Sequence, residues 1–207
     1  MAHSLTCRYG WKGLLLDGRH ENSTINLHQE FITADNIVQL FDKYNVPAEP
    51  DYVSIDIDSA DIWVLRAIIS SGKYRPRVLT AEYNSNLPLH STLTWPREHV
   101  GTWTDGTRFY GSGLGAFRAV AKEAGYSIVW VLPHDVFFVR NDLLKGVTEV
   151  HPFTRFKGCS GVPIHRPIQN QLARFEEYHT YVRTGSSTAA AAAAQQQMEE
   201  MRVDLST

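Results

Sequence analysis

Several features that mark whole classes of protein are absent from this sequence of 207 residues. It has only two cysteines, Cys7 and Cys159, which lie far apart and without CxxC spacing. This argues against a disulfide framework or a zinc site, and predicts thiols kept reduced in the cytoplasm or another reducing internal compartment. No apolar run approaches the length that spans a membrane, and the first residues resemble neither a signal peptide nor a transit peptide. We therefore expect an internal protein without a membrane segment.

An excess of charge of either sign is also lacking. Twenty Lys and Arg residues stand against twenty-two Asp and Glu residues, which gives a formal net charge of -2. Without an overall basic field the chain has no general attraction for phosphate backbones or anionic lipids. We expect neither nucleic acid nor membrane among its partners.

The composition favours one folded domain followed by a tail. With 43% hydrophobic and 11% aromatic residues, the chain can bury a single sizeable core. We place this domain at residues 1–183. From 184 to 207 the sequence is rich in alanine and glutamine, a low-complexity composition that cannot build a core.

Strand and helix patterns alternate along the domain, which predicts an α/β fold. Near-continuous apolar strands separated by amphipathic helices are typical of a mostly parallel sheet that is covered on both faces. The apolar runs lie at 14–16, 52–58 and 78–83, and the helical patterns at 35–44, 59–69, 112–124 and 168–181.

Two later strands, at 127–132 and 136–140, are separated by only three residues. That gap is too short for a parallel crossover, so we expect an antiparallel pair at the edge of the sheet. Residues 87–107 lack periodicity and predict a long loop. Aromatic and histidine side chains in and just after this loop either line a pocket or anchor its packing: His90, Trp95, His99, Trp103 and Tyr110.

Acidic residues follow the apolar runs, and this is where open α/β sheets bind their ligands. Asp17 ends the first run, and Asp56, Asp58 and Asp61 follow the second. Glu82, with Asn84 close behind it, ends the third. Asp17 suits a ribose-binding acid or, with Gly18, an ordinary Asp-Gly turn. Asp56 predicts a specific role because a strand carboxylate is costly to bury, whereas Asp58 and Asp61 also suit helix capping.

The order of these blocks resembles the FkbM-type branch of S-adenosylmethionine (SAM)-dependent methyltransferases. The resemblance rests on YGWKGLLLDG at 9–18, SIDID at 54–58, YRPRV at 74–78, EYN at 82–84 and VFFVR at 136–140. It implies a Rossmann-like sheet of seven strands with the last two antiparallel. It also implies SAM as the methyl donor, with Asp17 and Gly18 at its ribose and Asp56 beside the donor methyl group. Asp56, Asp58, Glu82 and Asn84 would then form the catalytic edge.

One block of that family has no counterpart here. Its members carry a first strand and a glycine-rich turn that approach the methionyl part of SAM, and that strand lies between those ending in Asp17 and Asp56. An open slot would leave two rows of backbone groups unpaired. We expect the two strands to pair directly. The alternative is a strand from a partner chain or from an upstream segment.

Three functions remain open at this point. The first is SAM-dependent methyl transfer to oxygen or nitrogen of a small molecule, glycan or lipid. The second is a degenerate methyltransferase fold that serves as a structural or binding subunit, with a protein partner that completes the sheet or orders the tail. The third is a manganese-dependent glycosyltransferase, because Asp56 and Asp58 form a DxD pattern.

Overall fold

The computed structural model describes residues 9–97, 110–146 and 176–178, together with Ala192. The tail at 184–207 apart from Ala192, most of the helix expected at 168–181 and the second half of the 87–107 loop lie outside these residues. The described part has mixed α/β content, in agreement with the sequence pattern. None of its helices is long and apolar enough to cross a lipid bilayer.

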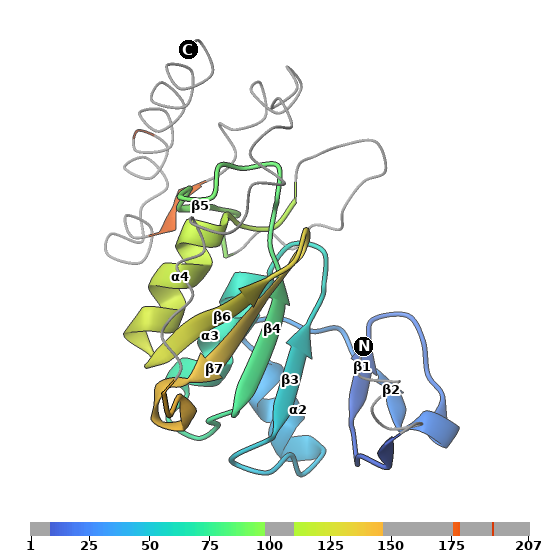
Figure 1. Cartoon of the computed structure of the whole chain (residues 1–207). Coiled ribbons are helices and arrows are strands. Elements are labelled where there is room, and N and C mark those ends of the chain that lie inside the picture. Colours follow the sequence, from blue (N-terminus) through green and yellow to red (C-terminus); the bar gives the residue numbers. More distant parts are fainter. Residues whose placement is uncertain (1–8, 98–109, 147–175, 179–191, 193–207) are drawn as a thin grey trace.

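A four-stranded sheet forms the centre of the described fold, with its strands in the order β3-β4-β7-β6 (Figure 1). β3 and β4 are parallel, whereas β7 is antiparallel to both of its neighbours. The sheet is therefore mixed, and the prediction of a mostly parallel sheet is wrong for this part of the chain. The bounds are Tyr52–Ile55 for β3, Val78–Glu82 for β4, Tyr126–Val131 for β6 and Asp135–Arg140 for β7.

The prediction of an antiparallel pair at the edge is confirmed. Leu132 donates its backbone N–H to the carbonyl of Asp135 at 2.8 Å, which closes a tight turn between β6 and β7. The hairpin places β6 at the sheet edge and β7 beside β4. Because β7 runs against β4, its first residue, Asp135, lies opposite Glu82 at the end of β4.

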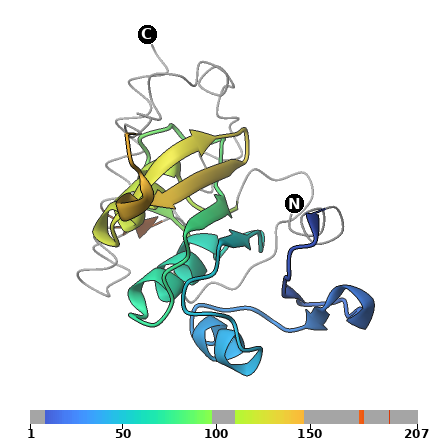
Figure 2. The ribbon, with the colours of Figure 1, turned by 60° about the horizontal axis from the view of Figure 1, so that its bottom comes forward.

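The described helices lie over one face of this sheet (Figures 1 and 2). Their apolar residues interlock with alternate residues of the strands, and Phe117 packs on Phe138 with ring centroids 6.2 Å apart. We expected helices on both faces; those described cover only one. The helices are α2 at Ile37–Lys43, α3 at Asp61–Ser70 and α4 at Leu114–Glu123.

The first strand of the chain belongs to a separate sheet. β1 at Leu15–Asp17 pairs in parallel with β2 at Leu27–Gln29, and the residues between them include a short 3-10 helix at Ser23–Ile25. Among the described strands, β1 pairs only with β2 and β3 pairs only with β4. The direct pairing that we expected between the strands ending in Asp17 and Asp56 is therefore wrong.

Several local expectations also need correction. Asp35 does not begin a helix: α2 starts after Asn36, and Asp35 forms an ion pair with Arg97. Neither Asp58 nor Ser59 caps α3, whose N-cap residue, Ala60, has no side-chain cap. Glu176–Glu177 form β8 rather than helix, because their backbone pairs with β5 at Leu93–Thr94 in the loop.

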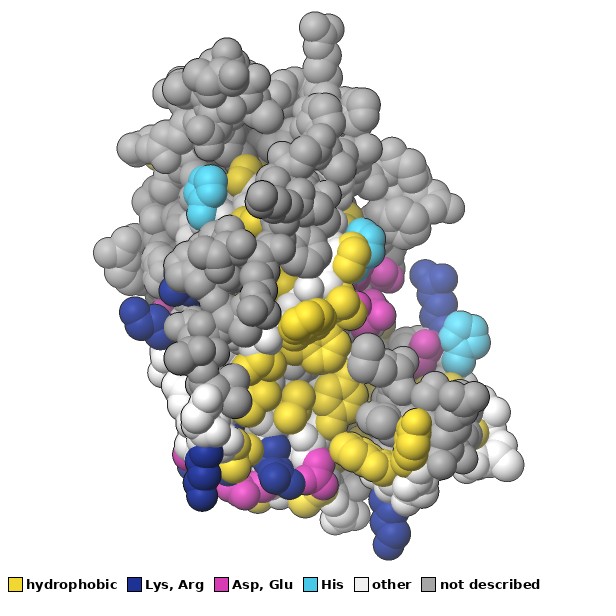
Figure 3. Space-filling view, in the orientation of Figure 1, with side chains coloured by type: hydrophobic (Ala, Val, Ile, Leu, Met, Phe, Trp, Pro, Cys, Tyr) yellow, Lys and Arg dark blue, Asp and Glu magenta, His cyan; other side chains and the backbone are white. Residues whose placement is uncertain are grey.

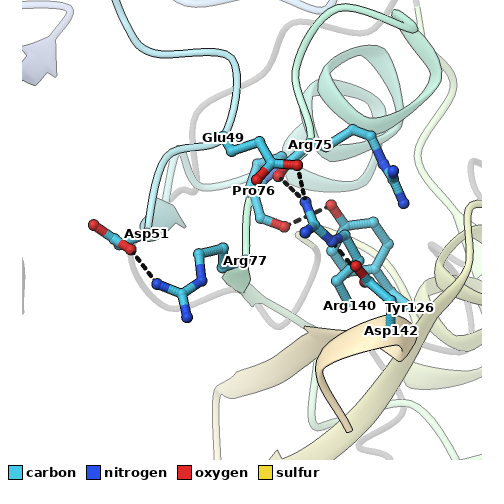
Figure 4. A network of polar contacts seen from close by, with 8 residues as sticks. All are labelled: Glu49, Asp51, Arg75, Pro76, Arg77, Tyr126, Arg140 and Asp142. Atoms are coloured by element: carbon cyan, nitrogen blue, oxygen red, sulfur yellow. Dashed lines mark hydrogen bonds and ion pairs between the residues drawn. The ribbon is translucent and has the colours of Figure 1, made fainter.

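A buried arginine fixes the end of the sheet that lies away from the predicted site. The Arg140 guanidinium donates to Glu49 at 2.9 Å, to Asp142 at 2.7 Å and to the carbonyl of Arg75 at 2.9 Å (Figure 4). Tyr126 donates to the carbonyl of Pro76 at 2.7 Å in the same network. These contacts hold the hairpin against the segment that enters β4.

The start of α4 approaches the loop so closely that only glycine fits at Gly115. A Cβ atom there would lie 2.3 Å from the carbonyl oxygen of His90. The loop is held at this point by a hydrogen bond from Ala116 N–H to the carbonyl of Ser91 at 3.2 Å. This contact fixes the loop that leaves β4 against the helix.

We predict that Gly115→Ala destabilises the protein, although alanine normally favours a helix over glycine by about 1 kcal/mol. The overpacking against backbone should cost about 1 to 3 kcal/mol and exceed that gain. Urea unfolding measures the change. Gly18→Ala is the matched control, since a Cβ at Gly18 meets only the Phe31 ring at 3.6 Å. Equal or higher stability of Gly115→Ala would contradict the close approach.

Candidate acidic site at the carboxyl edge of the sheet

Asp56 and Glu82 lie side by side because their strands are parallel and in register. Ile55 of β3 pairs with Ala81 of β4, so the next residues of the two strands reach the same edge. Ile55 and Ala81 are buried in the core below the helices. Since side chains alternate between faces, Asp56 and Glu82 belong to the opposite face. We expected Asp17, Asp56 and Glu82 to end neighbouring parallel strands and to face one cleft. This holds for Asp56 and Glu82, but it is wrong for Asp17, whose strand β1 pairs with β2 in a separate sheet.

Asp58 completes a group of three carboxylates. One oxygen from each of Asp56, Asp58 and Glu82 lies within 4.8 Å of the other two. Asp56 and Asp58 are exposed and Glu82 is half-buried. In the space-filling view, acidic side chains lie beside an apolar surface toward one end of the sheet (Figure 3). In the described part of the chain no Lys or Arg pairs with these three carboxylates.

Asp61 is buried at the start of α3, directly after the turn that leads from β3. Its carboxylate accepts a hydrogen bond from the backbone N–H of Ile57 at 3.1 Å. Asp58, between the two, has a positive φ of 70°, a backbone conformation that favours glycine or asparagine. The Asp61 hydrogen bond therefore holds a turn that directs Asp58 back toward the strand ends.

Burial and mutual repulsion disfavour the charged forms of these acids. Burial raises the pKa of Glu82 to about 8, and the nearby charges of Asp61, Asp56 and Asp58 add to this. Burial raises the pKa of Asp61 to about 7 against the effect of its backbone hydrogen bonds. The pKa of Asp56 is also raised, first by burial and then by Asp58 and Asp135. Near neutral pH the cluster can therefore both hold and accept protons.

Asp135 belongs to this electrostatic group, and the sequence gave no reason to include it. It is the first residue of β7, and its proximity to Glu82 depends on the antiparallel pairing of β7 with β4. The sequence predicted the hairpin of β6 and β7, but it did not predict that β7 pairs with β4. Without that strand order, Asp135 could not be assigned to the acidic group.

Asn84 is buried and uses its amide to build the loop. Its Nδ2 donates to the carbonyl of Tyr110 at 2.9 Å, and its Oδ1 accepts from the backbone N–H of Asn86 at 2.9 Å. Trp95 is buried as well, and its carbonyl accepts from the Trp63 indole at 2.7 Å. Asn84 and Trp95 thus anchor the loop beside the acidic edge.

Asp17 lies apart from the cluster, at the end of β1. Its Oδ1 accepts from the backbone N–H groups of Arg19 at 2.7 Å and His20 at 2.9 Å. These bonds, first that from Arg19, hold the pKa of Asp17 below its usual value. They form the Asp-Gly turn that the sequence offered as one alternative. Gly18 lies within this turn and is exposed.

A cleft separates β1 from β3. It has a volume of about 460 Å³, and both strands line it along their length. Leu14, Leu15 and Leu16 form one wall and the residues from Tyr52 to Ile57 form the other, with Asp56 among them. Among the described residues, β1 and β3 are therefore separated by a cleft and not joined by a strand ladder.

Comparisons with known proteins identified no relative of this chain. No family model matches the chain, and no curated protein and no solved structure is significantly similar to it.

We predict that the protein loses stability as the pH rises from about 5 to 8. The unfolded chain releases the Glu82 and Asp61 protons near the ordinary values of 4.5 and 3.8, whereas the folded chain holds them to about 8 and 7. Between its unfolded and folded pKa values, each group lowers the free energy of unfolding by up to about 1.4 kcal/mol per pH unit. The lowered pKa of Asp17 acts only at acid pH.

Melting temperatures measured across this pH range test the expectation. Glu82→Gln should flatten the decline, whereas Glu21→Gln, a change at an exposed glutamate in the loop before β2, should leave it unchanged. A wild-type melting temperature that stays constant or rises from pH 5 to 8 would show that these acids ionise freely.

Proposed function

We propose that this protein is a Rossmann-like protein of the SAM-dependent methyltransferase type. Its acidic edge would bind a hydroxyl or amine of a small molecule, glycan or lipid that accepts the methyl group. The meeting of Asp56, Asp58 and Glu82 beyond the parallel strands β3 and β4 carries the proposal. Open α/β sheets place their ligands at this edge.

The order of the strands supports the same proposal. The FkbM-type resemblance implies a sheet whose last two strands are antiparallel. In the β3-β4-β7-β6 order, β6 and β7 are such a pair, at one edge of the sheet. β1 and β2 would then be the other half of the same sheet, on the far side of the cleft.

Glu82 is the group best suited to take a proton from the acceptor. A general base works best when its pKa lies near the working pH, and the pKa of Glu82 is raised to about 8. Asp56, level with Glu82 on the neighbouring strand, would accept a second hydrogen bond and orient the acceptor. Asn84, held in the loop by its own hydrogen bonds, would position this edge rather than touch the acceptor.

The described residues fit one part of SAM and not the other. Asp17 ends a strand and carries an exposed carboxylate, as a ribose-binding acid must. The methionyl part needs a glycine-rich turn that lets backbone approach it, and no described strand lies between β1 and β3 to supply such a turn. Within the described residues, SAM binding should therefore rest on its adenosine half alone.

We predict that adenosine and SAM bind with dissociation constants within about threefold of each other, and that methionine does not bind, because only the nucleoside half gains contacts. Asp17→Ala should weaken both by about 1.5 to 3 kcal/mol, the range for hydrogen bonds to a charged acceptor. Calorimetric titration measures all three ligands.

Glu21→Gln, on the same side of the molecule but outside the strands, is the matched control for Asp17→Ala. Unchanged adenosine affinity in Asp17→Ala would show that this carboxylate serves only its turn. SAM binding a hundredfold tighter than adenosine would reveal a methionyl site, and no binding of either would remove the cofactor from the proposal.

The carboxylate cluster also favours a second candidate, a manganese-dependent glycosyltransferase. Asp56 and Asp58 form its DxD pattern, and three carboxylate oxygens within 4.8 Å of one another suit a hard divalent cation. The two candidates differ in what they require. A glycosyltransferase needs Mn²⁺ for binding a nucleotide sugar, whereas methyl acceptor binding at Glu82 does not.

A further inference from the structure

The face of the central sheet opposite the described helices carries one row of side chains across all four strands. The strand register places its members side by side, in the order Ser54, Thr80, Phe137 and Trp130. Cross-strand partners project on the same face, so the row offers hydroxyls at one end and aromatic rings at the other. The Glu82 carboxylate lies two residues beyond Thr80 on β4, on the same face and at the carboxyl edge.

A β-bulge brings Trp130 to this face. Ile128 pairs with Phe138 and Trp130 pairs with Phe137, so Val129 is an extra residue between the two pairs. Without it, strict alternation from the buried Ile128 would place Trp130 in the core. Trp130 is instead 54% exposed, on a face whose apolar surface is visible beside acidic side chains in Figure 3. Bulges that redirect a side chain in this way are enriched next to active sites.

At the other end of the row the hydroxyl groups form a directed chain. Thr80 donates its hydroxyl hydrogen to Ser54 Oγ at 3.0 Å. Since a hydroxyl carries one hydrogen, the 2.7 Å contact between Thr80 and the Tyr52 hydroxyl has Tyr52 as its donor. Thr80 is buried, whereas Ser54 is exposed and keeps its own hydrogen to donate outward. The chain therefore orients Ser54 as a hydrogen-bond donor on the surface of the sheet.

A ligand that satisfies this array must present three kinds of group. Glu82 accepts a hydrogen bond, Ser54 donates one, and the rings of Phe137 and Trp130 offer apolar surface. An organic cation supplies donors without an acceptor, and an alkyl chain supplies apolar surface alone. The hydroxyls of a sugar both donate and accept, and the C–H groups of its ring form an apolar face. The row crosses three strand spacings, about 14 Å, which is longer than one sugar ring.

We propose that this face of the sheet binds a carbohydrate. Sugar hydroxyls bond to Glu82 and Ser54 near the carboxyl edge, and a neighbouring ring of the same glycan lies over Phe137 and Trp130. The inference deepens the proposed function, on which its catalytic meaning rests, because it names a glycan hydroxyl as the methyl acceptor. Binding of the sugar itself needs no SAM, so it is measured separately from the cofactor.

NMR titration of the full chain with simple sugars tests the carbohydrate site. The probes are the methyl glycosides of glucose, galactose, mannose and fucose. The control ligands are cyclohexanol, an apolar ring with one hydroxyl, and choline, an organic cation. At least one glycoside should shift the Trp130 indole N–H signal, assigned by its loss in Trp130→Phe. That glycoside should bind at least about tenfold more tightly than either control, because only the sugar meets all three requirements.

Variants of the row locate the binding. Ser54→Ala should weaken the glycoside about twofold to tenfold, the range for one neutral hydrogen bond. Ser127→Ala is the matched control, since this serine of β6 already donates to Asn141 at 2.7 Å, and it should leave the affinity unchanged. Trp130→Ala should weaken binding by a similar factor, whereas Trp130→Phe should retain most of it. The backbone amide signal of Phe137 reports on both Trp130 variants.

Three results would overturn the carbohydrate site. They are no shift with any glycoside, equal affinity for cyclohexanol or choline, and equal weakening by Ser54→Ala and Ser127→Ala. Equal affinity for a control ligand would identify the face as an apolar or a cation-binding surface. Adenosine titrations report separately on the proposed function. Adenosine binding without glycoside binding would overturn this inference alone, whereas glycoside binding without adenosine binding would keep the sugar site and remove methyl transfer.

Discussion

The parallel pairing of β3 with β4 is the constraint from which the candidate site follows. Its register sets Asp56 level with Glu82, and the turn held by Asp61 brings Asp58 back to them. The antiparallel return of β7 adds Asp135 opposite Glu82. Three chain segments thus deliver acidic side chains to one edge, and burial together with their repulsion raises the pKa of Glu82 to about 8.

The same fold keeps its stabilising charges elsewhere. The Arg140 network lies at the opposite end of β4, where a buried guanidinium has three acceptors. The acidic edge has no comparable cation in the described part of the chain. Natural proteins accept such a local conflict mainly where function requires it, since an unpaired acidic group costs stability. This contrast between the two ends makes the edge the candidate site.

The sequence was most informative where a local rule decides the structure. The three-residue gap at 133–135 predicted the hairpin, and acids placed after apolar runs predicted the meeting of Asp56 and Glu82. It failed where structure depends on distant partners. Glu176–Glu177 form a strand because β5 pairs with them, and Asp35 pairs with Arg97. β1 and β3 do not pair with each other, although among the described strands each has only one partner.

The central claim is that the acids at the carboxyl edge have no compensating cation in the part of the chain that the structure describes, and the pKa of Glu82 tests this claim most directly. A carbon-13 NMR titration of the glutamate side-chain carboxyl groups, assigned by comparison with Glu82→Gln, measures its pKa in the folded protein. The account predicts a value near the 8 that burial and the neighbouring acids produce. A value close to the ordinary 4.5 would show that the Glu82 carboxylate is freely solvated, and would contradict the claim that this edge holds uncompensated acids.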